Sequence, residues 1–410
     1  MPFDPPAPTV SPAVWLDRRT PPHIVTLVML TGLSALSLNV MLPSLPAIAA
    51  WYRVDYSTVA LAISGYLGLT AILQLGLGPL SDRLGRRPVL IGCTAVFLVA
   101  TAGCALAPTI EVFLAFRMLQ AVIASGFALS RAIVRDMVRP DEAASLLGYV
   151  TMGMSLVPMI SPVIGGWLDE TFGWQSVFLL MLVFGLAVLA LLVLDLGETN
   201  LAPSASFAAQ FRAYPELLRS RRFWGYASTA ALASGAFFSL LGGGPWVATE
   251  LLAMSPSSLG FHFGFVSAGY LVGNFLSGRY TMRVGLNGMM LSGAIVATAG
   301  MLVIAVFFAL GVQTPLSFFG PLFLLGAGNG LLLPSANAGI VSVRPHLAGS
   351  ASGLGGALMI GAGALLSVAA GALLAPGTGA WPLIWIMLLC SALGIGTTLW
   401  VMRIERGNPL

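Results

Sequence analysis

The sequence has no lysine and little charge of either sign. All 19 basic side chains are arginine, and charged residues make up 8% of the 410 positions. Soluble globular chains carry about 25% charged residues, whereas 57% of this chain is hydrophobic. The composition excludes an ordinary soluble domain and indicates a protein built for a lipid bilayer.

Cysteine and histidine are also scarce. The three cysteines, Cys93, Cys104 and Cys390, lie inside apolar runs, which suits reduced, buried thiols rather than a disulfide framework. The three histidines fall at or outside the ends of such runs. Because no nucleophile-base pair and no metal-ligand spacing can be assembled, we predict no enzyme activity, no metal and no cofactor.

Twelve apolar runs recur along nearly the whole chain, each long enough to span a bilayer. They predict helices at residues 24–46, 57–80, 88–107, 111–134, 143–167, 174–195, 223–247, 259–280, 287–310, 316–340, 347–374 and 382–402. The first run ends in a sequence resembling a signal-peptidase site, but it is longer than a signal peptide's apolar region and eleven runs follow it. We therefore expect it to be retained.

The arginines predict how the chain is oriented. With a cytoplasmic N-terminus, seventeen of the nineteen fall in inside segments, Arg53 lies outside and Arg117 lies within the fourth helix. This is the positive-inside pattern. The net charge of +4 thus reflects topology and not a nucleic-acid partner. Both termini are expected in the cytoplasm, with residues 1–23 and 404–410 as tails.

A fall in hydropathy at residues 197–222 predicts a cytoplasmic linker between two six-helix halves, 24–196 and 223–403. The halves also repeat each other at an offset of 200 residues: Gly78, Arg83 and Gly85 recur as Gly278, Arg283 and Gly285. Parallel repeats of this kind build many transporters. Met282 stands where the first copy has Asp82, so the acid is expected in one half only.

The first of these loops reads Gly-Pro-Leu-Ser-Asp-Arg-Leu-Gly-Arg-Arg-Pro from Gly78 to Pro88. It resembles the loop between helices two and three of major facilitator superfamily transporters. Asn39-Val-Met-Leu-Pro-Ser-Leu-Pro46 is similar to the Asp-Met-Tyr-Leu-Pro-x-Leu-Pro signature of the Bcr/CflA drug-resistance exporters. Arg117-Met-Leu-Gln120 resembles the Arg-x-x-Gln motif of helix four, and Ser161-Pro-Val-Ile-Gly-Gly166 resembles the antiporter signature of helix five.

The resemblance implies an all-α integral membrane protein with the major facilitator fold, twelve transmembrane helices in two pseudo-symmetric halves. It also implies a bacterial inner-membrane efflux transporter for small amphipathic compounds, such as phenicol or bicyclomycin-like antibiotics. Export would use alternating access and proton antiport, with a small-molecule substrate, protons and the lipid bilayer as partners and a monomer as the working unit.

Arg117 leaves two interpretations open. It lies five or six residues into the fourth predicted helix, roughly 8 to 9 Å from its end at about 1.5 Å per residue. The side chain could snorkel to the outer interface. It could instead face the central cavity, with Gln120 on the same helix face. We favour the cavity, because an arginine inside a membrane segment usually marks a functional site.

Asn39 departs from the family's aspartate, the acid thought to couple proton and drug movement. An amide cannot titrate, and no Asp or Glu lies in the middle third of any predicted helix. Asn39 and Arg117 lie at similar depths, which predicts a hydrogen bond between them. An uncoupled facilitator therefore stays open beside the proton antiporter.

Asp82 is the candidate gate. The family counterpart holds the inner ends of helices two, four and eleven together when the cavity opens outward, and Arg131 and Arg135 are the expected partners. The start of helix eleven adds a helix-dipole contact. The alternative is a solvated loop cluster that only sets topology. The predicted gating residues are Gly78, Asp82, Arg83, Gly85, Arg86, Arg87, Arg131 and Arg135.

Small residues and prolines in helix five, Pro158, Pro162, Gly165 and Gly166, predict a kink and close packing on helix eight beside Gly269, Gly273 and Gly278. Plain packing and a gating hinge both remain open for them. The predicted cavity residues are Asn39, Tyr66, Gln74, Arg117, Gln120, Phe237, Phe238, Asn274 and Asn329.

Two other functions remain open. An importer or carrier of a metabolite or anionic solute would use the charge of Arg117 to attract its substrate. A membrane sensor without transport would need a soluble output domain, and the longest loop, Leu196 to Arg222, is too short for one.

Overall fold

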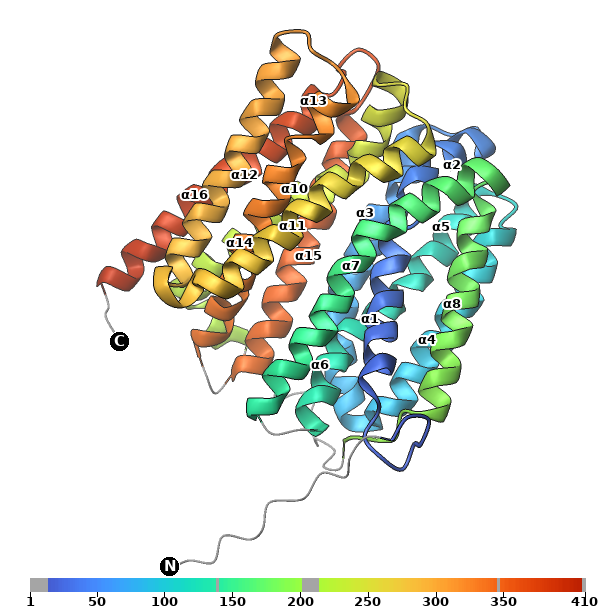
Figure 1. Ribbon diagram of the computed structural model, residues 1–410, viewed down its shortest axis with the longest axis vertical. Helices are drawn as coiled ribbons and strands as arrows, with labels where there is room; N and C mark the ends of the chain where they lie inside the picture. Colours follow the sequence, from blue (N-terminus) through green and yellow to red (C-terminus); the bar gives the residue numbers. More distant parts are fainter. Residues whose placement is uncertain (1–13, 138–139, 201–213, 345–346, 408–410) are drawn as a thin grey trace, which may run out of the picture.

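The computed structural model describes residues 14–137, 140–200, 214–344 and 347–407, and the side chains of Arg135, 140–145 and 147–156 lie outside that description. The first thirteen residues of the predicted tail, together with Arg139 and Arg212, also fall outside it. Within the described residues every regular element is helical (Figure 1).

The first half of the chain forms a group of helices shown in blue to green in Figure 1. Its elements are α1 (Ile24–Asn39), η1 (Leu42–Ser44), α2 (Leu45–Tyr52), α3 (Tyr56–Leu84), α4 (Arg86–Leu106), α5 (Ile110–Leu119), η2 (Gln120–Ala124), α6 (Ser125–Met137), α7 (Pro140–Phe172) and α8 (Gln175–Leu194). Within it, α1 packs on α7, α4 on α8 and α3 on α5.

The second half forms the group shown in yellow to red. Its elements are α10 (Arg221–Trp246), the π turn η3 (Val247–Leu251), α11 (Pro256–Val284), α12 (Leu286–Ala309), α13 (Pro315–Phe319), α14 (Leu322–Ser342), α15 (Ala348–Leu373) and α16 (Trp381–Gly407). Here α11 and α12 pack on α14, and α10 packs on α15 and α16.

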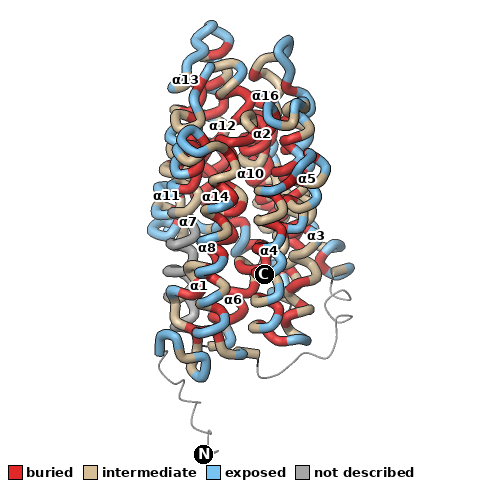
Figure 2. Tube along the Cα trace, turned by 90° about the vertical axis from the view of Figure 1, so that its right-hand side faces the viewer, coloured by how far each residue is buried: buried red, intermediate tan, exposed pale blue. Residues whose placement is uncertain are grey.

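The expected spans are present as helices. Eleven helical segments of the described chain are long and apolar enough to cross a bilayer. The remaining position, predicted at 143–167, is occupied by the 33-residue α7. Buried residues run along the length of both groups, between bands of exposed ones (Figure 2).

Three predicted helices are broken, and one of them, 316–340, divides into α13 and α14. The first ends at Asn39, and the chain turns through η1 before α2 restarts. Pro43 and Pro46, each in the first turn of a new segment, explain the restart, because proline lacks the N–H that continues a helix. The fourth predicted helix changes to the 3₁₀ segment η2 directly after α5, the helix that carries Arg117. A 3₁₀ segment in the middle of a helix often marks a functional position.

The predicted loop after helix two is almost entirely helical. The α3 helix continues to Leu84, four residues beyond the predicted end, and α4 begins at Arg86. The whole turn is made at Gly85, whose φ of +99° is open to glycine and costly for other residues. The second turn repeats this geometry at Gly285, with φ of +80°. The last helix likewise extends to Gly407, into the predicted tail.

The halves meet along two helix pairs, α3 with α15 and α7 with α11. The start of α1, the end of α3 and the linker lie at one end of the molecule, which we call the linker face. The opposite end is the far face. At the far face, the Tyr56 hydroxyl donates to the Gly242 carbonyl at 2.8 Å, and the Ser257 amide donates to the Glu170 carboxylate at 3.2 Å. Both bonds join the two halves.

Helix α7 packs on α11 through the predicted Pro162 and Gly166, but not beside the predicted glycines of α11. Its Pro162 and Gly166 meet Gly260 and Pro256 in backbone contact. Gly269 and Gly273 instead face α14, and a Cβ at Gly278 would meet nothing within 4 Å. Helical spacing placed these glycines on α11 correctly, but it could not say which of two neighbouring helices they face.

Candidate transport site

Arg117 is the central feature of the first half. It occupies the last turn of α5, a helix started by Thr109, whose hydroxyl accepts from the Val112 amide. Its side chain has no exposed surface. The snorkelling interpretation is therefore wrong, because a snorkelling guanidinium would reach the interface.

The guanidinium joins α5 to two other helices. Its Nε donates to the Ala62 carbonyl of α3 at 3.1 Å, and its Nη2 donates to the Ser37 carbonyl of α1 at 2.9 Å. Its Nη1 donates to the Ser37 hydroxyl at 3.3 Å and to Gln120 Oε1 at 2.7 Å. The ring of Tyr66 lies 4.3 Å from the guanidinium carbon, in cation–π geometry.

Gln120 extends this network to a fourth helix. Its Nε2 donates to the Thr101 hydroxyl of α4 at 2.8 Å, and that hydroxyl donates to the Phe97 carbonyl at 2.7 Å. The predicted pair of Arg117 and Gln120 is thus in contact, at the start of η2. Neutral oxygens and an aromatic face hold the buried cation, a costly arrangement unless every donor is used.

Asn39 lies near this network but does not join it through Arg117. Its Nδ2 donates to the Ala35 carbonyl of its own helix at 2.8 Å. The predicted hydrogen bond between Asn39 and Arg117 is therefore wrong, and α1 contributes Ser37 in its place. Sequence depth placed both residues at one level but could not give their direction around the helix.

The predicted residues of the second half lie in a separate group. Asn329 of α14 is buried, and its Nδ2 donates to the Ala233 carbonyl of α10 at 3.1 Å. Phe237 and Phe238 of α10 are half-buried with ring centroids 5.8 Å apart, and Phe238 packs on Gly363 of α15. These contacts join α10 to its neighbours without a charge.

Two predicted cavity residues lie on helices that join the halves. Gln74 of α3 is half-buried, and its side-chain oxygen lies against Gly356 of α15. Asn274 of α11 is also half-buried, and its backbone amide packs against Gly330 of α14.

Among the described side chains Asp82 pairs with a residue other than the predicted Arg131, and the side chain of the other predicted partner, Arg135, lies outside the description. The Asp82 carboxylate forms an ion pair of 2.5 Å with Arg86, one turn later along the chain. Arg86 also donates from Nε to Asp136 of α6 at 3.1 Å and from Nη1 to the Ser81 hydroxyl at 2.5 Å. Arg86 thus links α3 and α4 to α6, whereas the carboxylate of Asp82 is not paired with Arg131.

The motif also binds the start of the linker. The Glu198 carboxylate accepts from the backbone amides of Arg86 at 2.9 Å and Arg87 at 3.2 Å. A carboxylate at the N-terminus of α4 satisfies amides that have no partner within the helix. The Arg87 side chain donates to the Leu196 and Val193 carbonyls. A side chain on Gly85 would collide with Glu198.

The antiporter motif of α7 faces two directions. Gly165 contacts the backbone of Val40, just after the end of α1, and Gly166 contacts Pro256 of α11. Pro158 and Pro162 lie within the helix, which continues unbroken to Phe172. The Ser267 hydroxyl of α11 donates to the Pro158 carbonyl at 3.3 Å.

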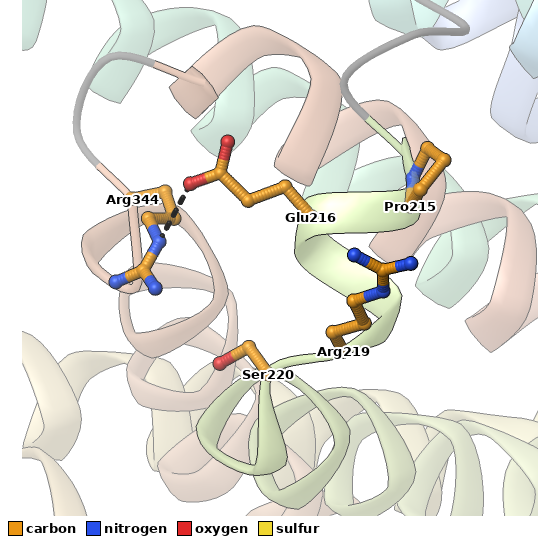
Figure 3. Close-up of a pocket in the computed structure, with 5 residues that line it drawn as sticks. All are labelled: Pro215, Glu216, Arg219, Ser220 and Arg344. Carbon is orange, nitrogen blue, oxygen red and sulfur yellow. Dashed lines mark hydrogen bonds and ion pairs between the residues drawn. The ribbon is translucent and has the colours of Figure 1, made fainter.

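A pocket of about 460 Å³ lies at the linker face, lined by Pro215, Glu216, Arg219, Ser220 and Arg344 (Figure 3). Arg344 Nε donates to the Glu216 carboxylate at 2.9 Å, and both side chains are about half exposed. None of its lining residues belongs to the predicted cavity set. It marks where the end of the linker joins the second half.

Two buried acids lie outside the predicted site residues. Asp195 closes the end of α8 and accepts from the Leu16 and His23 amides and from the Thr26 hydroxyl, so it anchors the start of α1. Asp169 of α7 is buried beside Ser44, and its Oδ2 has no hydrogen-bond partner. Asp169 follows the proline and glycine motif of α7, and the prediction took in the motif alone.

Comparison with curated proteins gives relatives over most of the chain. The MFS-type transporter YdgK of Bacillus subtilis is 31% identical over 346 residues, covering 80% of this chain and 83% of YdgK. The chloramphenicol resistance protein of Pseudomonas aeruginosa is 29% identical, covering 80% and 79%. The multidrug resistance protein MdtL of Shigella dysenteriae is 29% identical, covering 91% and 93%.

Solved structures give the same fold. A bacterial homologue of the human lysosomal transporter Spinster, in an inward-facing and unoccupied conformation, aligns with a TM-score of 0.71 at 17% identity, covering 94% of this chain and 98% of that one. The human organic anion transporter MFSD10 aligns with a TM-score of 0.69 at 19% identity, covering 92% and 98%.

The family model described as Major Facilitator Superfamily matches residues 27–366, which run from α1 through the linker and into α15. The expected fold is therefore confirmed, and transport, not enzyme catalysis, is the activity of its relatives. This chain is a multi-pass membrane protein that belongs to the major facilitator superfamily of transporters.

Proposed function

We propose that this protein is a multidrug efflux transporter of the Bcr/CflA type, which exports small amphipathic compounds by alternating access. The names of two relatives, a chloramphenicol resistance protein and the multidrug resistance protein MdtL, support this substrate class. Because Asn39 stands where the family has aspartate, the assignment to the Bcr/CflA type rests on Arg117, Gln120 and the motifs of α3 and α7.

The observation that carries the mechanism is where the halves bind each other. At the far face, hydrogen bonds from Tyr56 and Ser257 cross from one half to the other. At the linker face, the ion pairs of Arg86 and Arg222 each close within one half. Among the described residues the two ends therefore differ in how the halves are bonded, a difference that alternating access requires.

In this proposal the first half and the second half move relative to each other, and residues 197–222 connect them. The linker is attached to both: Glu198 binds the start of α4, and Leu217 is buried in the same apolar cluster as Phe223 and Val343. It can therefore hold the halves together while they rock.

The chemistry around Arg117 supports a neutral substrate. All three nitrogens of the guanidinium already donate to oxygens of the protein, and the Tyr66 ring covers its face. An anionic solute would have to displace these bonds before it could pair with the charge. Export of neutral amphipathic compounds is thus favoured over carriage of an anion.

The proposed location is the bacterial inner membrane with both termini in the cytoplasm, which makes the linker face cytoplasmic. Seventeen of the nineteen arginines in the sequence fall in the predicted inside segments. That distribution follows the positive-inside rule.

The test is uptake of labelled chloramphenicol into inverted membrane vesicles, with and without an imposed inside-acid pH gradient. Vesicles without the protein provide the background. Gradient-driven uptake that a protonophore abolishes would support proton antiport. Saturable uptake that ignores the gradient would support an uncoupled facilitator. Uptake no faster than background would contradict the proposed substrate class.

A further inference from the structure

Asp169 lies at the point where α7 packs against the broken first helix. Gly165 and Asp169 are one turn apart on α7, and they face Val40 and Ser44, which are also four residues apart. Gly165 lets the two backbones touch at Val40. The Asp169 carboxyl is thereby brought beside Ser44 in η1, at the far face.

The neighbouring row of α7 forms the contact between the halves. Gly166 meets the backbone of Pro256, and Glu170 accepts from the Ser257 amide. These residues are each one position from Gly165 and Asp169. The environment of Asp169 therefore depends on whether α7 and α11 are together, although Asp169 itself contacts the first half.

The Asp169 carboxyl is buried, and no ion pair of the described residues offsets the cost of its charge. Asp169 is 8% exposed, its Oδ2 has no hydrogen-bond partner, and the Ser44 hydroxyl is also unpartnered. The ion pairs of the described residues do not include Asp169. Burial beside a single hydroxyl, that of Ser44, and without a cation disfavours the ionised carboxylate, whereas the neutral acid carries an O–H that can pair with that hydroxyl.

The surrounding helices supply no charge that would offset this. Residues 24–44 and 175–194 contain no Asp, Glu, Arg or His. The titratable residue in the first three turns of α11 is His262, whose ring packs on Phe265 and Phe319. The adjacent acid on α7, Glu170, adds repulsion to an ionised Asp169.

We propose that Asp169 is a proton-binding site, occupied when the far face is closed and vacated when α7 and α11 separate and water reaches the carboxylate. Closing the far face then takes up one proton from that side of the membrane. This inference rests on the alternating access proposed above, and it gives the transporter a titratable acid near the position where Asn39 replaces the family aspartate.

The test measures far-face closure directly. Spin labels are placed at Ser57→Cys and Ala375→Cys, two exposed positions beside the contact of Ala60 with Gly371. The native cysteines, Cys93, Cys104 and Cys390, are replaced by alanine. Distance distributions are recorded by pulsed electron paramagnetic resonance in nanodiscs at pH 5.5 and pH 8.5.

The labelled parent should be mostly closed at pH 5.5, and its open fraction should rise at least threefold at pH 8.5. Asp169→Asn should stay closed at both pH values, because its amide cannot ionise. Asp169→Ala tests the same loss if the asparagine variant misfolds. Glu111→Gln, an exposed acid in the first turn of α5 at the far face, is the matched control and should respond to pH as the parent does.

A parent whose distances ignore pH would overturn the proposal, as would an Asp169→Asn variant with the parent's pH response. A loss of response in Glu111→Gln alone would assign the effect to that residue instead. The same variants are tested for chloramphenicol uptake. Absent uptake with an intact pH response would contradict the proposed substrate and leave the proton site standing.

Discussion

The two halves share one architecture but differ in chemistry. In the first half, Arg117 ties α5 to α1 and α3, and Gln120 continues the network to α4. In the second half, the fourth helix reaches the first through one neutral amide, Asn329 to the Ala233 carbonyl. The same helix pairing is thus built once around a buried cation and once around an amide.

The linker face shows the same contrast. In the first half, Asp82 and Asp136 share Arg86 between α3, α4 and α6. In the second half, Met282 replaces the acid and is 95% exposed. There a single acid near the end of the chain, Glu405, accepts from Arg222, Tyr226 and Asn287. The expectation of an acid in one copy of the loop holds, and the second half moves its ionic contact to α16.

The contrast shows that two halves with the same fold need not carry the same functional groups. The helix positions repeat because both halves must bury the same apolar faces in lipid. The polar groups do not repeat, which concentrates the charge available for substrate or gate in the first half.

The largest effect is expected from removing the buried cation. Arg117→Ala leaves the Ala62 and Ser37 carbonyls without their donors, and each hydrogen bond to a charged group is worth about 1.5–3 kcal/mol. We expect loss of more than about tenfold in chloramphenicol uptake, since about 1.4 kcal/mol corresponds to tenfold, and a clearly lowered thermal midpoint.

Asn329→Ala is the matched variant in the other half. It removes one neutral hydrogen bond, worth about 0.5–1.5 kcal/mol, so its midpoint should fall less and its uptake should persist. Thermal unfolding in detergent and vesicle uptake check both variants. Equal losses in the two would show that the cation has no special role.

A smaller effect is expected at the linker face. Asp82→Asn removes a pair whose acid is 39% exposed, so its cost in stability should stay under about 1 kcal/mol. If Asp82 also holds the inner ends together in the outward-open state, uptake should fall severalfold while insertion stays intact. Uptake by inverted vesicles and fluorescence-detected size exclusion separate these effects.

Met282→Asp is the comparison for that variant, because it adds an acid at the equivalent, fully exposed position of the second half. It should leave uptake close to that of the parent. Full uptake by Asp82→Asn would rule out the latch, and Asp82 would then be part of a solvated cluster that sets topology.

The smallest effect on uptake is expected at the two tight turns, where the cost falls on stability. Gly85→Ala and Gly285→Ala each place a side chain at positive φ with extended ψ, at about 1–3 kcal/mol. The Gly85 variant must also displace Glu198, whereas a Cβ at Gly285 meets nothing within 4 Å. The thermal midpoint should therefore fall further for Gly85→Ala. The reverse order would mean that Glu198 yields without cost.

Much of the fold could be predicted from the sequence, because membrane helices obey local rules. A run of about 20 apolar residues must be helical to satisfy its backbone in lipid. The repeat at an offset of 200 pairs Gly85 with Gly285, and both glycines make the turn between two helices at positive φ. The break after Asn39 was missed because hydropathy averages over the prolines that cause it.

The site was predictable only as a set of residues. Arg117 and Gln120 were paired correctly, since three residues along a helix share a face. The rotation of α1, α3 and α6 against their neighbours decides the partners. Arg117 bonds Ser37 and not Asn39, and Asp82 pairs with Arg86 and not with Arg131.

The sequence by itself determined the membrane class, the positions of the spans and the family, because each depends on composition or on residues close together in the chain. Only the tertiary structure decided that Arg117 is enclosed by three helices and that Asp169 is buried beside Ser44. The physical reason is that the cost of a buried charge depends on its solvation and partners, and those partners come from segments far apart in the sequence.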